Sequence, residues 1–156
     1  MKYRILTDLE LKALENEFAK FLVASDIGSD EWVELNKKKQ VKALEIVESF
    51  SDSIFEDVLS RISYLEKIDS KEIKIFKTNK NNIELIAIKT HPNNNINFTE
   101  IENFALFLEE NIAAIEIYKG QKKYKPNRNQ ELFKMTEAGA AVTDEKFWRL
   151  MSKLVK

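Results

Sequence analysis

The stretch YKGQKKYKPNRNQELF, residues 118–133, holds the densest group of side chains that could bind a ligand. Five basic residues and no acid lie within the ten positions Lys119 to Arg128. Basic side chains on one surface can contact phosphates, and a tyrosine among them can stack on an unpaired base. Lys122, Lys123, Tyr124, Lys125 and Arg128 are therefore the candidates for a nucleic-acid contact, the alternative to a solvated loop.

The same stretch also fits a solvated loop that leads into a helix. Pro126 and Asn127 are typical of a helix start, and lysines commonly solvate loops. Tyr118 continues an apolar alternation, so we expect it to face the core rather than a ligand. Four acids in the neighbouring sequence would weaken the positive field: Glu109, Glu110, Glu116 and Glu131. A second basic cluster, Lys37–Lys39 followed by Lys42, would lengthen the surface only if the fold brought the two together.

An acid and a lysine two residues apart on a strand, with a further acid nearby, can hold Mg²⁺ and position an attacking water. Glu72 and Lys74 have this spacing, and Asp69 precedes them. The helix, three strands, helix and strand predicted here match the core order of restriction-endonuclease-like enzymes. The pair lies on the second predicted strand, whereas the motif of those nucleases usually lies on the third. Alternating Glu and Lys is also the ordinary composition of an exposed strand face, so a divalent-metal nuclease remains only a further alternative.

The sequence lacks the residues that several other common types of catalytic or binding site require. The chain has no cysteine and a single histidine, His91, which excludes thiolate metal sites and two-histidine metal motifs. The three glycines, Gly28, Gly120 and Gly139, are too far apart for a phosphate-binding loop. We expect no cofactor and no bound metal.

The last predicted helix carries the other candidate surface. It has more apolar side chains than one narrow stripe can hold, and Trp148 lies about 100° from Phe147 around the helix. Partly exposed aromatic groups often anchor protein interfaces. We therefore expect an interface formed by Phe147, Trp148 and Met151. The alternative is that this helix docks on its own domain and Trp148 covers the edge of that contact.

These residues must be positioned by a chain of 156 residues, 44% hydrophobic and 33% charged, with a formal net charge of −1. This composition is globular, and the length predicts one α+β domain over residues 1–156. The near-zero charge offers no global attraction for polyanions or anionic membranes. No segment has the length of a membrane span, and the N-terminus MKYRILTDLELK lacks the apolar run of a signal peptide, so we expect a cytoplasmic protein.

Helices are predicted at both ends of the chain. Thr7 and Glu10 form a capping box before a first amphipathic helix that extends to Leu22, and Ser29 caps a short second helix. A longer helix follows, with one buried face formed by Val41, Leu44, Val47, Ile54, Val58 and Ile62. The small polar residues in SFSDSIF favour helix caps, so two helices are the alternative to the single helix, bent at this stretch, that we expect. Near the C-terminus, helices are predicted over 129–139 and from Thr143 onward.

Between these helices the apolar period shortens to that of strands. The segments 63–69, 72–78 and 82–90 predict three strands, the last two as a hairpin. Residues 83–88 predict a central strand that is covered on both faces. A helix capped by Thr99 and a fourth strand over 113–118 follow. The prediction is a small three- to four-stranded mixed or antiparallel sheet between N-terminal and C-terminal helices.

Several patches resemble a family of uncharacterised bacterial cytoplasmic proteins. They are KYRILT, LENEFAKFL, FSDSIFEDVL, YLE at 64–66, KKY and RNQELFKMTEAG. The resemblance spans nearly the whole chain and rests on helix and core patterns. It implies a cytoplasmic single domain and offers no functional residues.

Together these features predict a non-enzymatic binding protein whose partner is another protein or a second copy of the chain. An RNA- or DNA-contacting accessory protein that uses residues 119–128 is the alternative.

Overall fold

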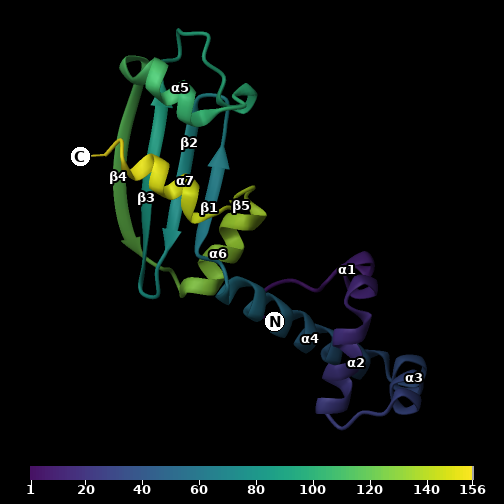
Figure 1. Cartoon of the computed structure of the whole chain (residues 1–156). Coiled ribbons are helices and arrows are strands. Elements are labelled where there is room, and N and C mark those ends of the chain that lie inside the picture. The colour runs from purple at the N-terminus through teal and green to yellow at the C-terminus, as the bar shows by residue number, and fades with distance from the viewer. Residues whose placement is uncertain (156) are drawn as a thin grey trace. The chain divides into compact units, whose positions relative to one another are not determined.

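The computed structural model describes residues 1–155, and the α+β class is confirmed (Figure 1). The chain divides into two compact units, Met1–Ser60 and Arg61–Lys156. The first unit is helical, and the second contains the sheet with the remaining helices. That both units form one domain stays a prediction, and each is described by itself.

Four helices form the first unit: α1 (Asp8–Ala13), α2 (Glu15–Ala24), α3 (Ser29–Lys38) and α4 (Gln40–Ser60). The capping box at Thr7 and Glu10 is confirmed. The prediction of one helix up to Leu22 is wrong, because Leu14 leaves helical geometry with φ −104° and ψ 23°. No glycine or proline marks this break in the sequence. The short helix α3 is capped by Gly28 rather than by Ser29.

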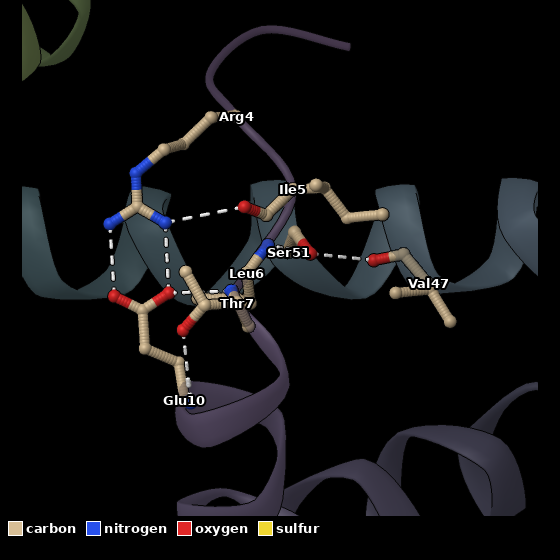
Figure 2. A network of polar contacts seen from close by, with 7 residues as sticks. All are labelled: Arg4, Ile5, Leu6, Thr7, Glu10, Val47 and Ser51. Carbon is tan, nitrogen blue, oxygen red and sulfur yellow. Dashed lines mark hydrogen bonds and ion pairs between the residues drawn. The ribbon is translucent and has the colours of Figure 1, made fainter.

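One buried hydroxyl group and one ion pair hold the N-terminal segment in place (Figure 2). Arg4 binds both carboxylate oxygens of Glu10, with Nη1–Oε2 and Nη2–Oε1 distances of 2.8 and 2.9 Å. The buried hydroxyl of Ser51 accepts the Leu6 N–H at 3.0 Å and donates to the Val47 carbonyl at 2.8 Å. Ser51 therefore lies inside α4 without leaving its hydroxyl unsatisfied, which explains why SFSDSIF does not end the helix.

The Arg4–Glu10 pair gives the first unit a pH-dependent stability. Hydrogen bonds from Arg4, and then from the Thr7 N–H, hold the pKa of Glu10 at about 2, below its ordinary 4.5. Between these values the unfolded chain binds the proton and the folded chain does not, so stability rises with pH. We expect the contribution of Glu10 to be full above pH 4.5 and to be lost as the pH falls towards 2.

Urea unfolding measured across this range tests the prediction. Each chain contains two tryptophans, Trp32 and Trp148, so a Trp148→Phe background leaves the fluorescence of Trp32 to report on the first unit. Glu10→Gln should flatten the acid limb of the stability curve, and Arg4→Met should flatten it as well. An identical slope in Glu10→Gln and its parent would contradict the role of this pair.

The core of the first unit centres on Phe50 in α4, which is 1% exposed. Its ring lies 4.9 Å from that of Phe18 and 5.4 Å from that of Phe21, measured between centroids. The prediction of one long helix is confirmed. Its predicted buried face is only partly correct, because three of the named residues are exposed: Val41, Leu44 and Val58.

A five-stranded antiparallel sheet forms the centre of the second unit. Its strands are β1 (Tyr64–Ile68), β2 (Glu72–Thr78), β3 (Asn82–Thr90), β4 (Ile115–Lys123) and β5 (Ala141–Val142). They lie in the order β4-β3-β2-β1-β5. The predicted hairpin of the second and third strands is confirmed. The predicted strand count is one short, because the two-residue β5 carries too little sequence pattern to be recognised.

One face of this sheet is covered by α5 (Phe104–Asn111) and α7 (Glu145–Ser152), as Figure 1 shows. Four buried isoleucines of β2 and β3 lie there: Ile73, Ile75, Ile86 and Ile88. The opposite face carries two buried β3 side chains, Ile83 and Ala87, and the half-buried Leu85. β3 therefore lies between two other strands and has buried side chains on both faces, as predicted.

The remaining helices are η1 (Phe98–Glu100), η2 (Ile112–Ala114) and α6 (Arg128–Glu137). α5 is capped by Asn103, whose side chain accepts the Leu106 N–H, and not by Thr99. α7 is capped by Asp144 rather than starting at Thr143. In both cases the cap is the residue whose oxygen reaches the free amides of the first turn.

Candidate binding groove between the last helix and strands β3 and β4

A groove of about 450 Å³ lies between α7 and the strands β3 and β4. Residues 84–86 of β3 and 119–121 of β4 line it on the sheet side, and Trp148, Ser152 and Val155 line it on the other. Ligand pockets usually have volumes of about 300–1,000 Å³. The groove is thus large enough for a side chain or a small ligand.

The register of the two strands explains the character of the floor. Glu84 pairs with Gln121, and Ile86 pairs with Lys119, so these four side chains share the face that α7 covers. The floor is apolar at Ile86 and polar around it. Glu84 accepts a hydrogen bond from Asn79 Nδ2 at 2.8 Å, which fixes its carboxylate at one end.

Trp148 is the aromatic wall of the groove. Its side chain is half-buried, packs against the sheet core, and has its ring centroid 6.2 Å from that of Tyr64. The Ser152 hydroxyl donates to the Trp148 carbonyl at 2.7 Å, one turn further along α7. The tryptophan is therefore held by its own domain while part of its surface remains available in the groove.

The other two predicted interface residues have different surroundings. Met151 is 0% exposed and belongs to the core cluster, so it has no surface to offer a partner. Phe147 is half-buried, and its ring centroid lies 5.6 Å from that of Phe104. Of the three candidates, Trp148 alone lines the groove.

The basic stretch is not the loop that its composition suggests. β4 extends to Lys123, and α6 begins at Arg128, so only residues 124–127 connect them. The six residues from Tyr118 to Lys123 are all exposed. The prediction that Tyr118 faces the core is wrong. Its side chain is exposed, and its hydroxyl donates to Glu72 Oε1 at 2.9 Å on the face of the sheet opposite α7.

Three of the five predicted nucleic-acid contact residues instead bind groups of the protein itself. Lys122 forms an ion pair with Glu131, and Tyr124 Oη donates to the Asn79 carbonyl at 2.6 Å. Arg128 donates to the Ile62 carbonyl and, at 3.2 Å, to Thr78 Oγ1. Lys123 and Lys125 are exposed, and within residues 1–155 their side chains form no ion pair.

Glu131 organises this corner of the second unit. Burial raises the pKa of its carboxyl. Hydrogen bonds from Lys122 and from the Lys125 N–H lower that pKa by more, so the net shift is downward. The carboxylate thus links β4, the connection and α6. Lys122 and the Lys125 N–H therefore hold this corner of the fold together through Glu131.

Glu72 and Lys74, the nuclease candidates, lie on one strand as predicted, but their side chains are held by contacts within the protein. Lys74 Nζ lies 3.2 Å from Glu72 Oε1, which confirms that the two share a face of β2. Glu72 also binds the Tyr118 hydroxyl and lies 3.5 Å from Lys89 Nζ. Burial raises the pKa of Glu72, and the hydrogen bonds from Tyr118 and Lys74 lower it to a net value below its usual range.

Asp69 is exposed at the turn between β1 and β2. Within residues 1–155, no group of three or more His, Cys, Asp or Glu side chains is arranged to hold a metal ion. The carboxylate set that the nuclease hypothesis requires is thus not assembled around Glu72. The other basic cluster, Lys37–Lys39, lies at the C-terminal end of α3 in the first unit.

Sequence reasoning missed the groove residues Glu84, Lys119, Gln121 and Ser152. A signal was present, since continuing the strand alternation from Ile117 places Lys119 and Gln121 on the same face. Reading residues 119–123 as a loop concealed that alternation. That α7 lies beside these two positions follows only from the packing of the helix.

A family model matches the chain over residues 1–156, and its description is a family of unknown function (DUF6495). A comparison with curated proteins finds no match, and neither does a comparison with solved structures.

Proposed function

Because the chain belongs to this family, which has no assigned activity, we propose from the groove itself that the protein is a non-enzymatic binding protein. Its partner is another protein or a second copy of the chain, and Trp148 is the apolar anchor of the contact. The observation that carries this proposal is the groove of about 450 Å³ with a half-buried tryptophan on its wall.

Tryptophan, tyrosine and arginine dominate the binding energy of protein interfaces, most strongly where a pocket excludes water around them. Trp148 has the required combination of fixed position and available surface. The polar groups around it can orient a bound segment: the Glu84 carboxylate, the Lys119 ammonium and the Ser152 hydroxyl. The lysines of β4 would raise the association rate of an acidic partner more than its affinity.

The proposal places the protein in the bacterial cytoplasm, as the sequence resemblance implies. Within residues 1–155, no helix has both the length and the apolar character needed to cross a membrane. Nucleic-acid contact ranks below protein binding, because Lys122, Tyr124 and Arg128 are held by internal contacts.

Trp148→Ala is expected to remove the partner without unfolding the chain. Loss of an interface anchor costs at least about 2 kcal/mol, which is roughly a thirtyfold loss of affinity. Tagged wild-type protein and the variant would be purified from the native host with and without nuclease, and the co-purified proteins compared. Circular dichroism of each purified chain would verify that the variant is folded.

Leu106→Ala is the matched control, because Leu106 is an exposed apolar residue of the same unit, on α5. It should retain the partner as well as the wild type does. Equal retention by Trp148→Ala would contradict the proposed site. Material that is lost on nuclease treatment would favour the nucleic-acid alternative.

A further inference from the structure

Strand β4 is an unusually open edge of the sheet. It is nine residues long, Ile115–Lys123, and pairs only with β3 among the strands of residues 1–155. An edge strand directs about half of its backbone N–H and C=O groups away from the sheet, where another chain can bind them. Residues 118–123 are all exposed, so the second half of this strand is accessible.

The exposed half of this edge is basic. Lys119, Lys122 and Lys123 lie within five residues, and no acid occurs between Ile117 and Lys125. Glu131 pairs with Lys122, which leaves Lys119 and Lys123 without an ion pair within the described residues. A chain lying along the edge would therefore be favoured if it carried carboxylates opposite these two lysines.

The groove and the edge adjoin one another. Lys119, Gly120 and Gln121 belong to both, because they line the groove and form the middle of the exposed strand. Side chains of an added strand would alternate between the two faces of the sheet. Those on the α7 side would lie next to the groove and Trp148. On the opposite face, a Cβ at Gly120 would have no atom within 4 Å, so there is room for a neighbouring side chain.

We propose that β4 binds an extended acidic segment of a partner protein as a sixth strand, with one of its apolar side chains in the groove beside Trp148. This inference rests on the proposed function, because it names the kind of partner that the groove holds. Main-chain hydrogen bonds along the edge would provide affinity, while the groove and the lysines would select the sequence. The other role of edge lysines is to prevent edge-to-edge aggregation, and the experiment below separates the two.

Phage-displayed random peptides of about ten residues, enough to span β4, would be selected on the immobilised full-length protein. We expect the enriched peptides to combine Asp or Glu with β-branched or aromatic residues. Lys123→Glu, which changes the edge outside the groove, should weaken the best peptide about tenfold at low salt, and less at high salt. Lys146→Glu is the matched control, since Lys146 is exposed near the start of α7, directly after the opposite edge strand β5. It should leave the affinity unchanged.

Hydrogen exchange of the complex and the Trp148→Ala variant separate the two proposals. Strand addition predicts slower exchange of the outward-facing amides of β4, and the groove predicts loss of binding in Trp148→Ala. Strand addition alone would be overturned by peptides that need Trp148 for binding but carry no acids and leave hydrogen exchange in β4 unchanged. Peptides that protect β4 but ignore Trp148 would overturn the groove alone. Failure to enrich any peptide would overturn strand addition and assign the lysines a protective role.

Discussion

Phe50→Ala is expected to lower the free energy of unfolding of the first unit by about 3–5 kcal/mol. The side chain is 1% exposed, and its ring centroid lies 4.9 Å from that of Phe18 and 5.4 Å from that of Phe21. Its removal loses the burial of the ring and leaves a cavity that α2 and α4 can fill only in part. Urea unfolding followed by Trp32 fluorescence in the Trp148→Phe background would measure the loss.

Val41→Ala provides the matched control on the same helix, since Val41 is 76% exposed. Exposed substitutions of this kind usually change stability by less than about 0.5 kcal/mol. Similar losses for Phe50→Ala and Val41→Ala would show that Phe50 is not the centre of this core. The comparison also tests which face of α4 is buried, the point on which the sequence prediction was only partly correct.

Met151→Ala is expected to lower the free energy of unfolding of the second unit by about 2–5 kcal/mol. Met151 is 0% exposed and packs with the isoleucines of β2 and β3 under α7. Truncation leaves a cavity between the helix and the sheet. Trp148 fluorescence in a Trp32→Phe background would follow the unfolding of this unit, because Trp148 is then the only tryptophan.

Arg149→Ala controls for a general effect of substitution in α7. Arg149 is exposed, and it pairs with Glu145 at a distance of 2.9 Å between Nη2 and Oε1. Exposed pairs of this spacing contribute about 0.3–0.5 kcal/mol. A Met151→Ala variant that kept its stability but lost its partner would return Met151 to the interface.

Local sequence patterns were sufficient for the elements whose signals lie within a few residues. The capping box at Thr7 and Glu10, the hairpin of β2 and β3, and the single long helix α4 were all predicted and are confirmed. Each depends on the spacing of neighbouring side chains, which the chain carries whatever surrounds it. The α+β class follows from the same change of period near residue 63.

Only the tertiary structure decided the length of β4, the existence of β5 and the use of the basic residues. Lysines at 119–123 resemble a loop, and it is pairing with β3 that makes them a strand. Arg128 and Tyr124 resemble ligand contacts, and carbonyl groups distant in sequence engage them instead. Composition cannot reveal such partners. An arginine or tyrosine is the same residue in the sequence whether its side chain faces solvent or donates to a distant carbonyl.

The candidate site, too, was determined partly by the sequence and partly by the tertiary structure. That the last helix has an apolar surplus around Trp148 was determined by the sequence, through the helical spacing of its side chains. That Met151 is fully buried while Trp148 stays half-buried was decided by how α7 packs across β2 and β3. A helix can bury only the side on which the sheet lies, and that side is chosen by contacts between segments more than fifty residues apart.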